Sequence, residues 1–484
     1  MRTVKEQEIL TLAPNANAVS NARKISSGNG FVVRKKSADD TFYMGECKGS
    51  GKKNYVVSAD YIDEEHPVFR CSCPSRQFPC KHSLALLFEM AAGKDFKVDE
   101  IPEDILEKRQ KKEAREAKKK SEGDKKPVSE KSAKAAKAAK TKKIKKQLEG
   151  LALMKQLLDN LMDMGLAAMG SVSLKTYRDL SKQLGDYYLP GPLVLFNRLI
   201  LEMEAFQKDQ DTEHYKKAVE ILKRLRTLER KANVYLNDKL EHDSPEADDD
   251  ELYEELGGIW KLEQLNDLGL KKENAKLLQL SFSVSYDEAR KEYIDLGYWI
   301  DVDSGEIFHT CNYRPVKALK HVKQEDSCFS LMNISTLTYY PGTVNRRVRW
   351  SGATFEDVEE HIYKQIIGKA YGDFGTMTKA VKNYIKNTLA EDYFPVMAAY
   401  EEIGTVSLEG KQIYVMMDIA GNRIELRKKE GWQDTVSMMP MLPNSVFFNK
   451  GAIFGLIYYD TSDRQICMHP CSMVKEQGIL RLLY

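Results

Sequence analysis

The sequence contains no run of about 20 apolar residues, the length that a membrane-spanning helix requires. Residues 190–206 are interrupted by Arg198 and by acidic residues, and residues 452–459 are only long enough for a strand. The first residues include no apolar segment of signal-peptide length. We therefore expect a soluble cytoplasmic protein with no membrane partner.

Cysteine is scarce, and its spacing does not suggest a disulfide framework. The chain has 8 cysteines in 484 residues; three of them lie close to His82, and the others are scattered. Disulfides are rare in the reducing cytosol, where clustered thiols are read as metal ligands. The cluster therefore points to a metal site.

A strong net charge is also absent, because 74 Lys or Arg residues balance 72 Asp or Glu residues to leave +2. This balance conceals one basic segment. Residues 107–147 hold 18 Lys or Arg against 6 Asp or Glu, a local net charge of +12, which leaves −10 for the rest of the chain. The segment has almost no large apolar residues, so conformational entropy opposes its folding. We predict a flexible Lys-rich linker, although its Ala and Lys content favours helix in part.

No catalytic signature is present. The glycines at 45–53 resemble a phosphate loop, but their spacing is wrong, and Lys53 stands where a Ser or Thr must bind magnesium. No Ser/His/Asp or Cys/His arrangement has a recognisable local pattern. We expect a protein without enzymatic activity. An enzyme with a polar pocket in the C-terminal region stays open as an alternative, because a sequence does not reveal such a pocket.

The apolar periodicity changes along the chain. Residues 41–93 are typical of strands followed by a helix, residues 148–240 and 260–280 of helices, and residues from Leu296 onward of strands. Two further helices are expected near 354–366 and 376–391, inserted among these strands. A chain of 484 residues is too long for one core.

These patterns predict a multidomain α+β protein. We expect a small ββα-like zinc module, a helical middle region and a β-rich C-terminal domain with inserted helices. The expected divisions are an N-terminal segment 1–40 with a short helix, the zinc module 41–95, the linker 107–147, a helical region 148–295 with an acidic loop at 243–255, and the C-terminal domain 296–484.

Four metal-ligand residues are closely spaced along the chain: Cys71, Cys73, Cys80 and His82. The first pair is separated by one residue in an extended segment, so both thiols lie on the same side. The second pair follows six residues later at the start of the expected helix. Three thiolates and one imidazole complete a tetrahedral set with no position for water, so we predict one structural zinc ion, Zn2+.

At these residues the chain resembles the SWIM zinc-finger family, whose pattern is C-x-C, a short spacer and C-x-H, and in particular its bacterial members. The resemblance is specific over residues 45–88 and loose elsewhere. It implies zinc binding together with a role in binding nucleic acid or protein. Bacterial members are often encoded beside MoxR-type AAA ATPases, so the resemblance also implies an adaptor role in a complex with such an ATPase.

Three basic residues flank the four ligands: Arg70, Arg76 and Lys81. They offer a candidate nucleic-acid surface in which the cations contact phosphates and Phe78 stacks on a base. The alternative is that they balance the negative charge of a three-thiolate zinc centre. Further along the chain, Arg347 and Arg349 alternate with apolar residues, and we expect them on a solvent-facing strand.

A second metal site is a weaker possibility at Cys467, His469 and Cys471, which alternate along an extended segment. Ordinary core residues are the default interpretation of these three side chains. Taken together, the sequence favours a zinc-binding interaction protein that acts as an adaptor for protein, nucleic acid or both. The alternative is a DNA- or RNA-binding protein without sequence specificity that acts through the basic surface around the zinc.

Overall fold

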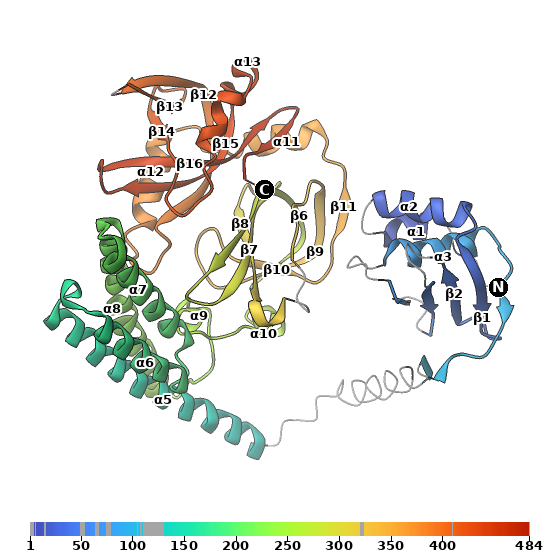
Figure 1. Cartoon of the computed structure of the whole chain (residues 1–484), viewed down its shortest axis with the longest axis horizontal. Helices are drawn as coiled ribbons and strands as arrows, with labels where there is room; N and C mark the ends of the chain where they lie inside the picture. The colour runs from blue at the N-terminus through green and yellow to red at the C-terminus, as the bar shows by residue number, and fades with distance from the viewer. Residues whose placement is uncertain are drawn as a thin grey trace. The chain divides into compact units, whose positions relative to one another are not determined.

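A computed structural model describes residues 4, 6–13, 16–48, 54–62, 67–73, 79–103, 105–106, 109, 130–319, 324–408 and 410–483. The chain divides into two compact units, Met1–Lys131 and Ser132–Tyr484. The multidomain α+β class is confirmed, because a small module of strands and helices is followed by long helices and then by extended strands (Figure 1).

The first unit, called the zinc module below, combines a five-stranded sheet with the helices α1, α2 and α3. The strand order is β4-β3-β2-β1-β5, and β5 joins β1 in parallel. The helices are α1 (Glu6–Leu12), α2 (Ala16–Ser27) and α3 (Lys81–Ala91), and the strands are β1 (Phe31–Lys36), β2 (Phe42–Cys47), β3 (Tyr55–Asp60), β4 (Val68–Cys71) and β5 (Lys97–Val98).

The prediction for residues 1–40 did not include strand β1. It also did not expect this segment to contribute side chains to the core of the module. β1 carries Arg34, Lys35 and Lys36 in succession, which conceals its strand character. Each of these cations has an acidic partner in the folded module: Glu89, Asp99 and Asp40, respectively. The N-terminal segment therefore belongs to the module and contributes Ile9, Ala22 and Phe31 to its core.

Helix α3 is the centre of the zinc module, since all its residues from His82 to Met90 are buried. Its apolar side chains pack beneath the sheet with Tyr43 and Val57. The one carboxylate in this helix, Glu89, is fully buried and accepts hydrogen bonds from Arg34 Nε and Ser26 Oγ, each at 2.5 Å. A buried charge needs such partners, because its desolvation is otherwise uncompensated.

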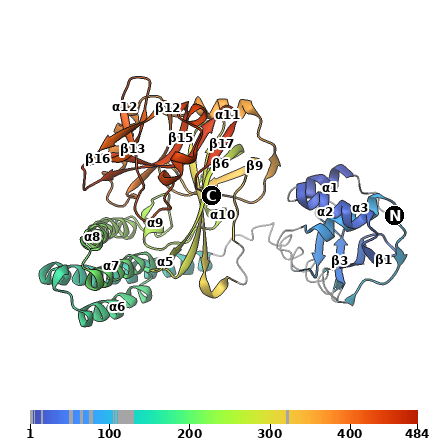
Figure 2. The same cartoon turned by 45° about the horizontal axis from the view of Figure 1, so that its top comes forward.

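The second unit begins with four long helices that lie side by side (Figure 2). They are α5 (Glu130–Met164), α6 (Ser171–Asp186), α7 (Pro190–Asp209) and α8 (Thr212–Glu241), with a single 3₁₀ turn, η1 (Leu166–Ala168), after the first. Leucines at helical spacing, among them Leu151, Leu158, Leu199 and Leu228, form their common core. The helical character predicted for residues 148–240 is confirmed.

The prediction of a flexible linker over 107–147 is wrong for its second half, because residues 130–147 are the first turns of α5. Of residues 107–129, only Arg109 belongs to the described part of the chain. Two causes explain the helix. Ala and Lys have high helix propensity. The segment also continues directly into the part of α5 that packs in the helical core, which begins at Ile144. Lys137 and Lys140 also pair with Asp243 and Glu246.

The acidic segment 243–255 is a loop that ends in a helical turn, α9 (Leu252–Glu255), and α10 (Leu262–Asp267) follows it. Strand β6 (Lys271–Asp287) begins directly after α10, so the expected helix over 260–280 is wrong from Lys271 onward. The strands thus start well before Leu296. Buried leucines at 277, 278 and 280 match helical and strand spacing equally well, and a short apolar run does not distinguish the two.

Strands β6 to β10 form a first barrel. The sheet order is β10-β9-β6-β7-β8, and a parallel bridge between His309 and Arg347 joins β8 to the entry of β10, which brings the two edges together. A short strand, β11, adds to β9. The bounds are β7 (Glu292–Asp301), β8 (Ile307–Pro315), β9 (Leu331–Tyr339), β10 (Val348–Trp350) and β11 (Thr354–Glu356), with a 3₁₀ turn, η2 (Val316–Ala318), after β8.

Strands β12 to β16 form a second barrel with the same connectivity. The order is β14-β13-β12-β15-β16, and β14 pairs in parallel with β16 to close the barrel. A last strand, β17, extends β16. The bounds are β12 (Tyr393–Leu408), β13 (Lys411–Met417), β14 (Arg423–Leu426), β15 (Asn449–Asp460), β16 (Gln465–Lys475) and β17 (Gly478–Arg481), with η3 (Val436–Met441) and α13 (Asn444–Phe447) between β14 and β15.

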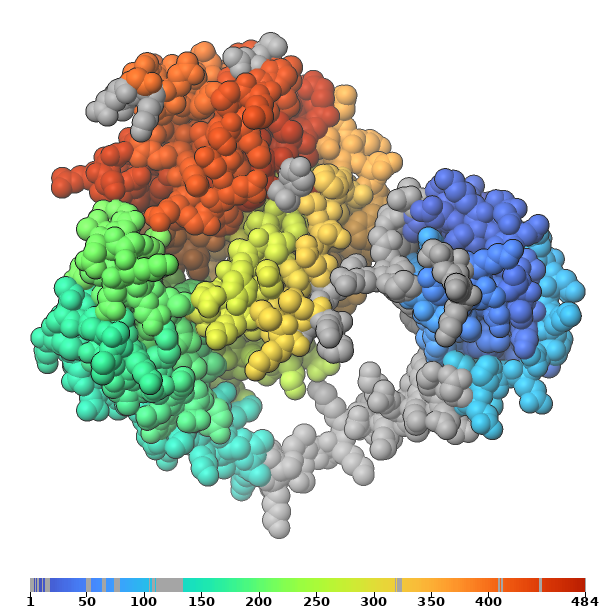
Figure 3. Space-filling view, viewed as in Figure 1, coloured from blue at the N-terminus to red at the C-terminus, as the bar shows by residue number. Residues whose placement is uncertain are grey.

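Two helices connect the barrels: α11 (Glu360–Ile367) and α12 (Phe374–Tyr384). Residues 354–356, expected at the start of the first helix, are strand β11 instead, and α11 begins six residues later than predicted, at Glu360. Ile362 and Ile366 of α11 share one apolar cluster with Tyr298 of the first barrel and Phe454 of the second. Figure 3 shows the green helical region, the yellow first barrel and the orange second barrel in contact.

Candidate metal centre and ligand cleft

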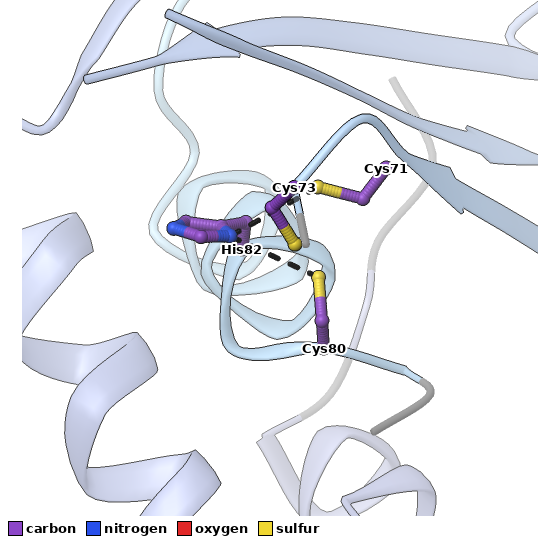
Figure 4. A group of neighbouring side chains, drawn as sticks. All are labelled: Cys71, Cys73, Cys80 and His82. Carbon is purple, nitrogen blue, oxygen red and sulfur yellow. Dashed lines mark hydrogen bonds between the residues drawn. The ribbon is translucent and has the colours of Figure 1, made fainter. Parts of the chain in front are cut away.

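The four predicted zinc ligands come together at one end of α3 (Figure 4). Cys71 ends β4, Cys73 follows two residues later, Cys80 immediately precedes α3, and His82 lies in its first turn. One ligand atom from each residue lies within 4.8 Å of all the others. The pairs are near in space because α3 folds back under the sheet, so the packing of the core positions the ligands.

The geometry fits a tetrahedral zinc ion. His82 Nδ1 lies 3.9 Å from both Cys71 Sγ and Cys80 Sγ. Zinc bonds of about 2.3 Å to sulfur and about 2.0 Å to nitrogen place such atoms roughly 3.5 Å apart, so a small contraction suffices. Cys80 is fully buried and His82 nearly so. Four protein ligands leave no coordination position for a substrate, and the zinc is structural.

The pKa values of the cysteine thiols in the cluster also favour the binding of a cation. The hydrogen bond from the Cys71 thiol, with those from His82 and Ser83, holds the pKa of Cys80 below its usual value, while the same contact raises the pKa of Cys71. The ring of Tyr55 packs on the imidazole at a centroid distance of 5.0 Å and fixes its orientation. One thiolate is thus already favoured, and a metal ion displaces the remaining protons.

Residues 70–90 match the SWIM zinc finger. This match covers the SWIM finger alone, within a much longer chain. No curated protein matches the chain. Among the described residues, none of the helices has the length and apolar character needed to cross a membrane.

Several solved structures resemble part of the chain at low scores. One is titled "Structure of murine DNA binding protein bound with ds DNA"; it has 11% identity and a TM-score of 0.20 and covers 43% of this chain and 96% of its own. A second, "Crystal structure of the tetrameric p202 HIN2", has 7% identity and a TM-score of 0.18 and covers 44% and 94%. These scores are too low to support an argument about this chain.

The basic residues of the SWIM finger do not form one free cationic surface in the described part of the module. Arg70 pairs with the buried carboxylate of Asp60 at 3.2 Å, and Arg109 contacts the same carboxylate at 2.7 Å. Lys81 is exposed at the start of α3. Arg76 lies outside the described residues. The nucleic-acid role of these three residues stays a prediction, and Arg70 is held by an internal partner.

Cys467, His469 and Cys471 are fully buried in β16, and the default interpretation as core residues agrees with the structure. They do not meet the geometry of a metal cluster; in the part of the chain that the structure describes, only the SWIM ligands do. Lys429 N donates to His469 Nδ1 at 3.3 Å, and burial lowers the pKa of His469 to about 4. The imidazole is therefore neutral at pH 7.

The second unit contains a large cleft, which the sequence did not predict. Its volume is about 1920 Å³, and its lining comes from α7, the turn at α9, the first barrel and the start of the second barrel. Pockets for small molecules usually measure about 300–1,000 Å³. A cleft of this size has room for a segment of a polymer.

One wall of this cleft is a face of the first barrel. His309, Cys311 and Tyr313 alternate along β8 and all line the cleft, as do Arg347 and Arg349 beside them. Val348, between the two arginines, is buried in the barrel core. Burial lowers the pKa of His309 to about 4, so this face carries arginine as its cation and not histidine.

Arginine and aromatic side chains are paired on this wall. Arg290 lies over the ring of Tyr313, with 5.0 Å between the guanidinium carbon and the ring centroid, and Arg347 lies over Tyr340 at 3.5 Å. Trp350 packs edge-on against the buried Trp299 at a centroid distance of 5.4 Å. The signal in the sequence was the alternation of basic and apolar residues at 347–350, which by itself does not locate a cleft.

Acidic residues also line the cleft. Glu251 immediately precedes α9, and Glu254 and Glu255 belong to it; these three residues are called the acidic turn below. Glu254 pairs with Arg347, and Glu255 with Arg224, at 3.1 Å each. Burial raises the pKa of both carboxyl groups. The acidic segment is therefore not a solvated linker throughout, because its last residues are packed against the first barrel.

Four buried donors of the cleft lining have no hydrogen-bond partner within the described residues: Arg224 Nε, Trp260 Nε1, Asn345 Nδ2 and Arg346 Nε. Buried donors are nearly always paired in folded proteins, because an unpaired donor loses its hydration without compensation. Buried donors without a partner are often found in binding sites, where a bound ligand accepts their hydrogen bonds.

Proposed function

We propose that this protein binds nucleic acid without catalysing a reaction, and that the two barrels carry the binding site while the SWIM finger is a zinc-stabilised interaction module. The observation that carries the proposal is the repeated strand connectivity. In both barrels the five strands follow the order 1-2-3-5-4, and strand 3 runs parallel to strand 5. This is the topology of the OB-fold, which binds oligonucleotides and oligosaccharides.

A fold alone does not determine a function. The residues of the cleft supply the second support. Single-stranded nucleic acid is bound by cations that follow the backbone and by aromatic rings on which bases stack. The cleft of the first barrel offers both, because Arg290, Arg349, Tyr313 and Trp350 are among the residues that line it.

The SWIM finger retains the role implied by its family, which is binding to nucleic acid or protein. Because Arg70 is held by Asp60, we assign the main nucleic-acid affinity to the barrels and not to the basic residues around the zinc. An adaptor role in a MoxR-type ATPase complex, and a cytoplasmic location, remain predictions of the sequence.

The test is fluorescence anisotropy with the full zinc-loaded chain and labelled 20-nucleotide single strands of DNA and RNA, titrated at several salt concentrations. We expect saturable binding that weakens steeply as salt rises, since phosphate contacts release counterions. Absence of binding at low salt would contradict the proposal. Binding of an oligosaccharide in place of nucleic acid would also contradict it, and would assign the barrels to the other ligand class of the fold.

A further inference from the structure

The ligand-binding parts of an OB-type barrel are the face of strands 2 and 3 and the loops between strands 1 and 2 and between strands 4 and 5. In the first barrel these are β7 and β8, residues 288–291 and residues 340–347. All four parts contribute to the lining of the same cleft, through residues such as Leu296, Tyr313, Arg290 and Asn345. The topology and the cavity therefore identify the same surface independently.

This surface exposes rings in positions where a base can stack. Tyr313 is 37% exposed although it belongs to a strand, and Phe329, at the rim, is 68% exposed. Trp350 is half-buried: it packs against the barrel core through Trp299, and it also lines the cleft. A ring that is already held by its packing loses little freedom when a base stacks on it.

The same surface holds an anion already. The carboxylate of Glu254 lies 3.1 Å from the guanidinium of Arg347, which is the residue that joins the loop 340–347 to β10. The side chains of both residues are about one quarter exposed, at 25% for Arg347 and 27% for Glu254, so an incoming ligand has access to the pair. A phosphate group can take the place of a carboxylate beside a guanidinium, because both groups accept two parallel N–H hydrogen bonds from it.

We propose that a single-stranded nucleic acid lies across β8 and the loop 340–347 of the first barrel, with bases on Tyr313 and Trp350 and phosphates on Arg347 and Arg349, and that Glu254 competes with the phosphates for Arg347. This inference rests on the proposed function and specifies its site, its ligand class and an internal competitor. Single strands are favoured over duplex, because stacking on a protein ring requires an accessible base face.

The test uses the full zinc-loaded chain and a 20-nucleotide oligo(dT) probe. Trp350→Ala and Tyr313→Ala each remove one stacking ring, and we expect each to weaken binding at least about five-fold. Glu254→Gln removes the competing charge and keeps the side-chain shape, and we expect it to tighten binding about three- to ten-fold. The matched control is Glu263→Gln, an exposed residue of the neighbouring helix α10, which should leave affinity unchanged.

Thermal unfolding of each variant checks that the second unit is folded. If the wild-type chain binds oligo(dT) and all four variants bind equally well, the site is wrong while the proposed function stands. If Glu254→Gln weakens binding, the competition is wrong. If duplex DNA of the same length binds more tightly than oligo(dT), the ligand class is wrong. If no nucleic acid binds the wild-type chain, both the inference and the proposed function fail.

Discussion

Arg347 of the first barrel and Glu254 of α9 form an ion pair of 3.1 Å in the lining of the cleft. The ring of Tyr340 lies beneath the same guanidinium, 3.5 Å away. These contacts connect the helical region to residues 340–347 of the first barrel. The geometry of the cleft therefore depends on the packing of α9 as well as on the barrel.

Zinc should be bound at one ion per chain and should hold the zinc module together. We expect Cys80→Ser to lose the metal and to unfold α3, because structural zinc contributes on the order of 10 kcal/mol to small domains. Metal analysis and hydrogen exchange of residues 81–91 measure the two effects. Cys328→Ser, a half-buried thiol of the second unit, is the control and should retain one zinc. A folded, metal-free Cys80→Ser chain would contradict a structural role.

The buried carboxylate of α3 should be important for the stability of the same module. Glu89→Ala leaves Arg34 without its partner and should lower the free energy of unfolding by about 3 kcal/mol. The reason is that removal of one member of a buried ion pair leaves the other charge desolvated without compensation. Denaturant unfolding of the zinc-loaded protein measures this change. Glu100→Ala, at an exposed position, should change it by less than about 0.5 kcal/mol.

Gly191 should tolerate no side chain. A Cβ at this position would overlap the carbonyl oxygen of Glu255, so Gly191→Ala must displace the acidic turn from the first turn of α7. We expect a loss of about 1–3 kcal/mol in the free energy of unfolding. Gly185→Ala is the matched control, because its Cβ would meet only Leu193 Cδ2, at 3.6 Å. Equal stability of the two variants would show that α9 is not packed as described.

Stability of the second unit should fall as the pH drops below 6.5. Burial lowers the pKa of His469 from 6.5 to about 4, so in this range the unfolded chain binds a proton that the folded chain does not. One such group lowers the free energy of unfolding by at most about 1.4 kcal/mol per pH unit, and the decrease ends near pH 4, where the folded protein also binds the proton. Unfolding of His469→Gln at pH 7 and pH 5 tests this: the variant should show a smaller difference than the wild type. An unchanged difference would mean that His469 does not titrate with folding.

The zinc site was predictable because its ligands are local. Cys71, Cys73, Cys80 and His82 lie within one short segment, and the coordination chemistry of zinc constrains both their number and their type. The extent of the module was less predictable. Strand β1 carries three consecutive cations, and two of their acidic partners, Glu89 and Asp99, are far away in sequence.

The barrels were not predictable as barrels, although several of their strands were. Each barrel depends on pairings between distant segments, such as the contact of Glu425 with Cys467 that closes the second one. Strand β6 also resembles a helix in its leucine spacing, and only its partners β7 and β9 determine its state. The ligand cleft depends in turn on these pairings, so its residues were visible in the sequence only as the basic–apolar alternation at 347–350.

The most direct measurement of where nucleic acid binds is photochemical cross-linking of oligo(dT) to the full chain, followed by mass spectrometry of the cross-linked peptides. We expect the cross-links to fall within β8 and residues 340–350, with Tyr313 and Trp350 among the modified residues. Cross-links confined to residues 70–90 of the SWIM finger would contradict it and would place the nucleic-acid surface at the zinc module.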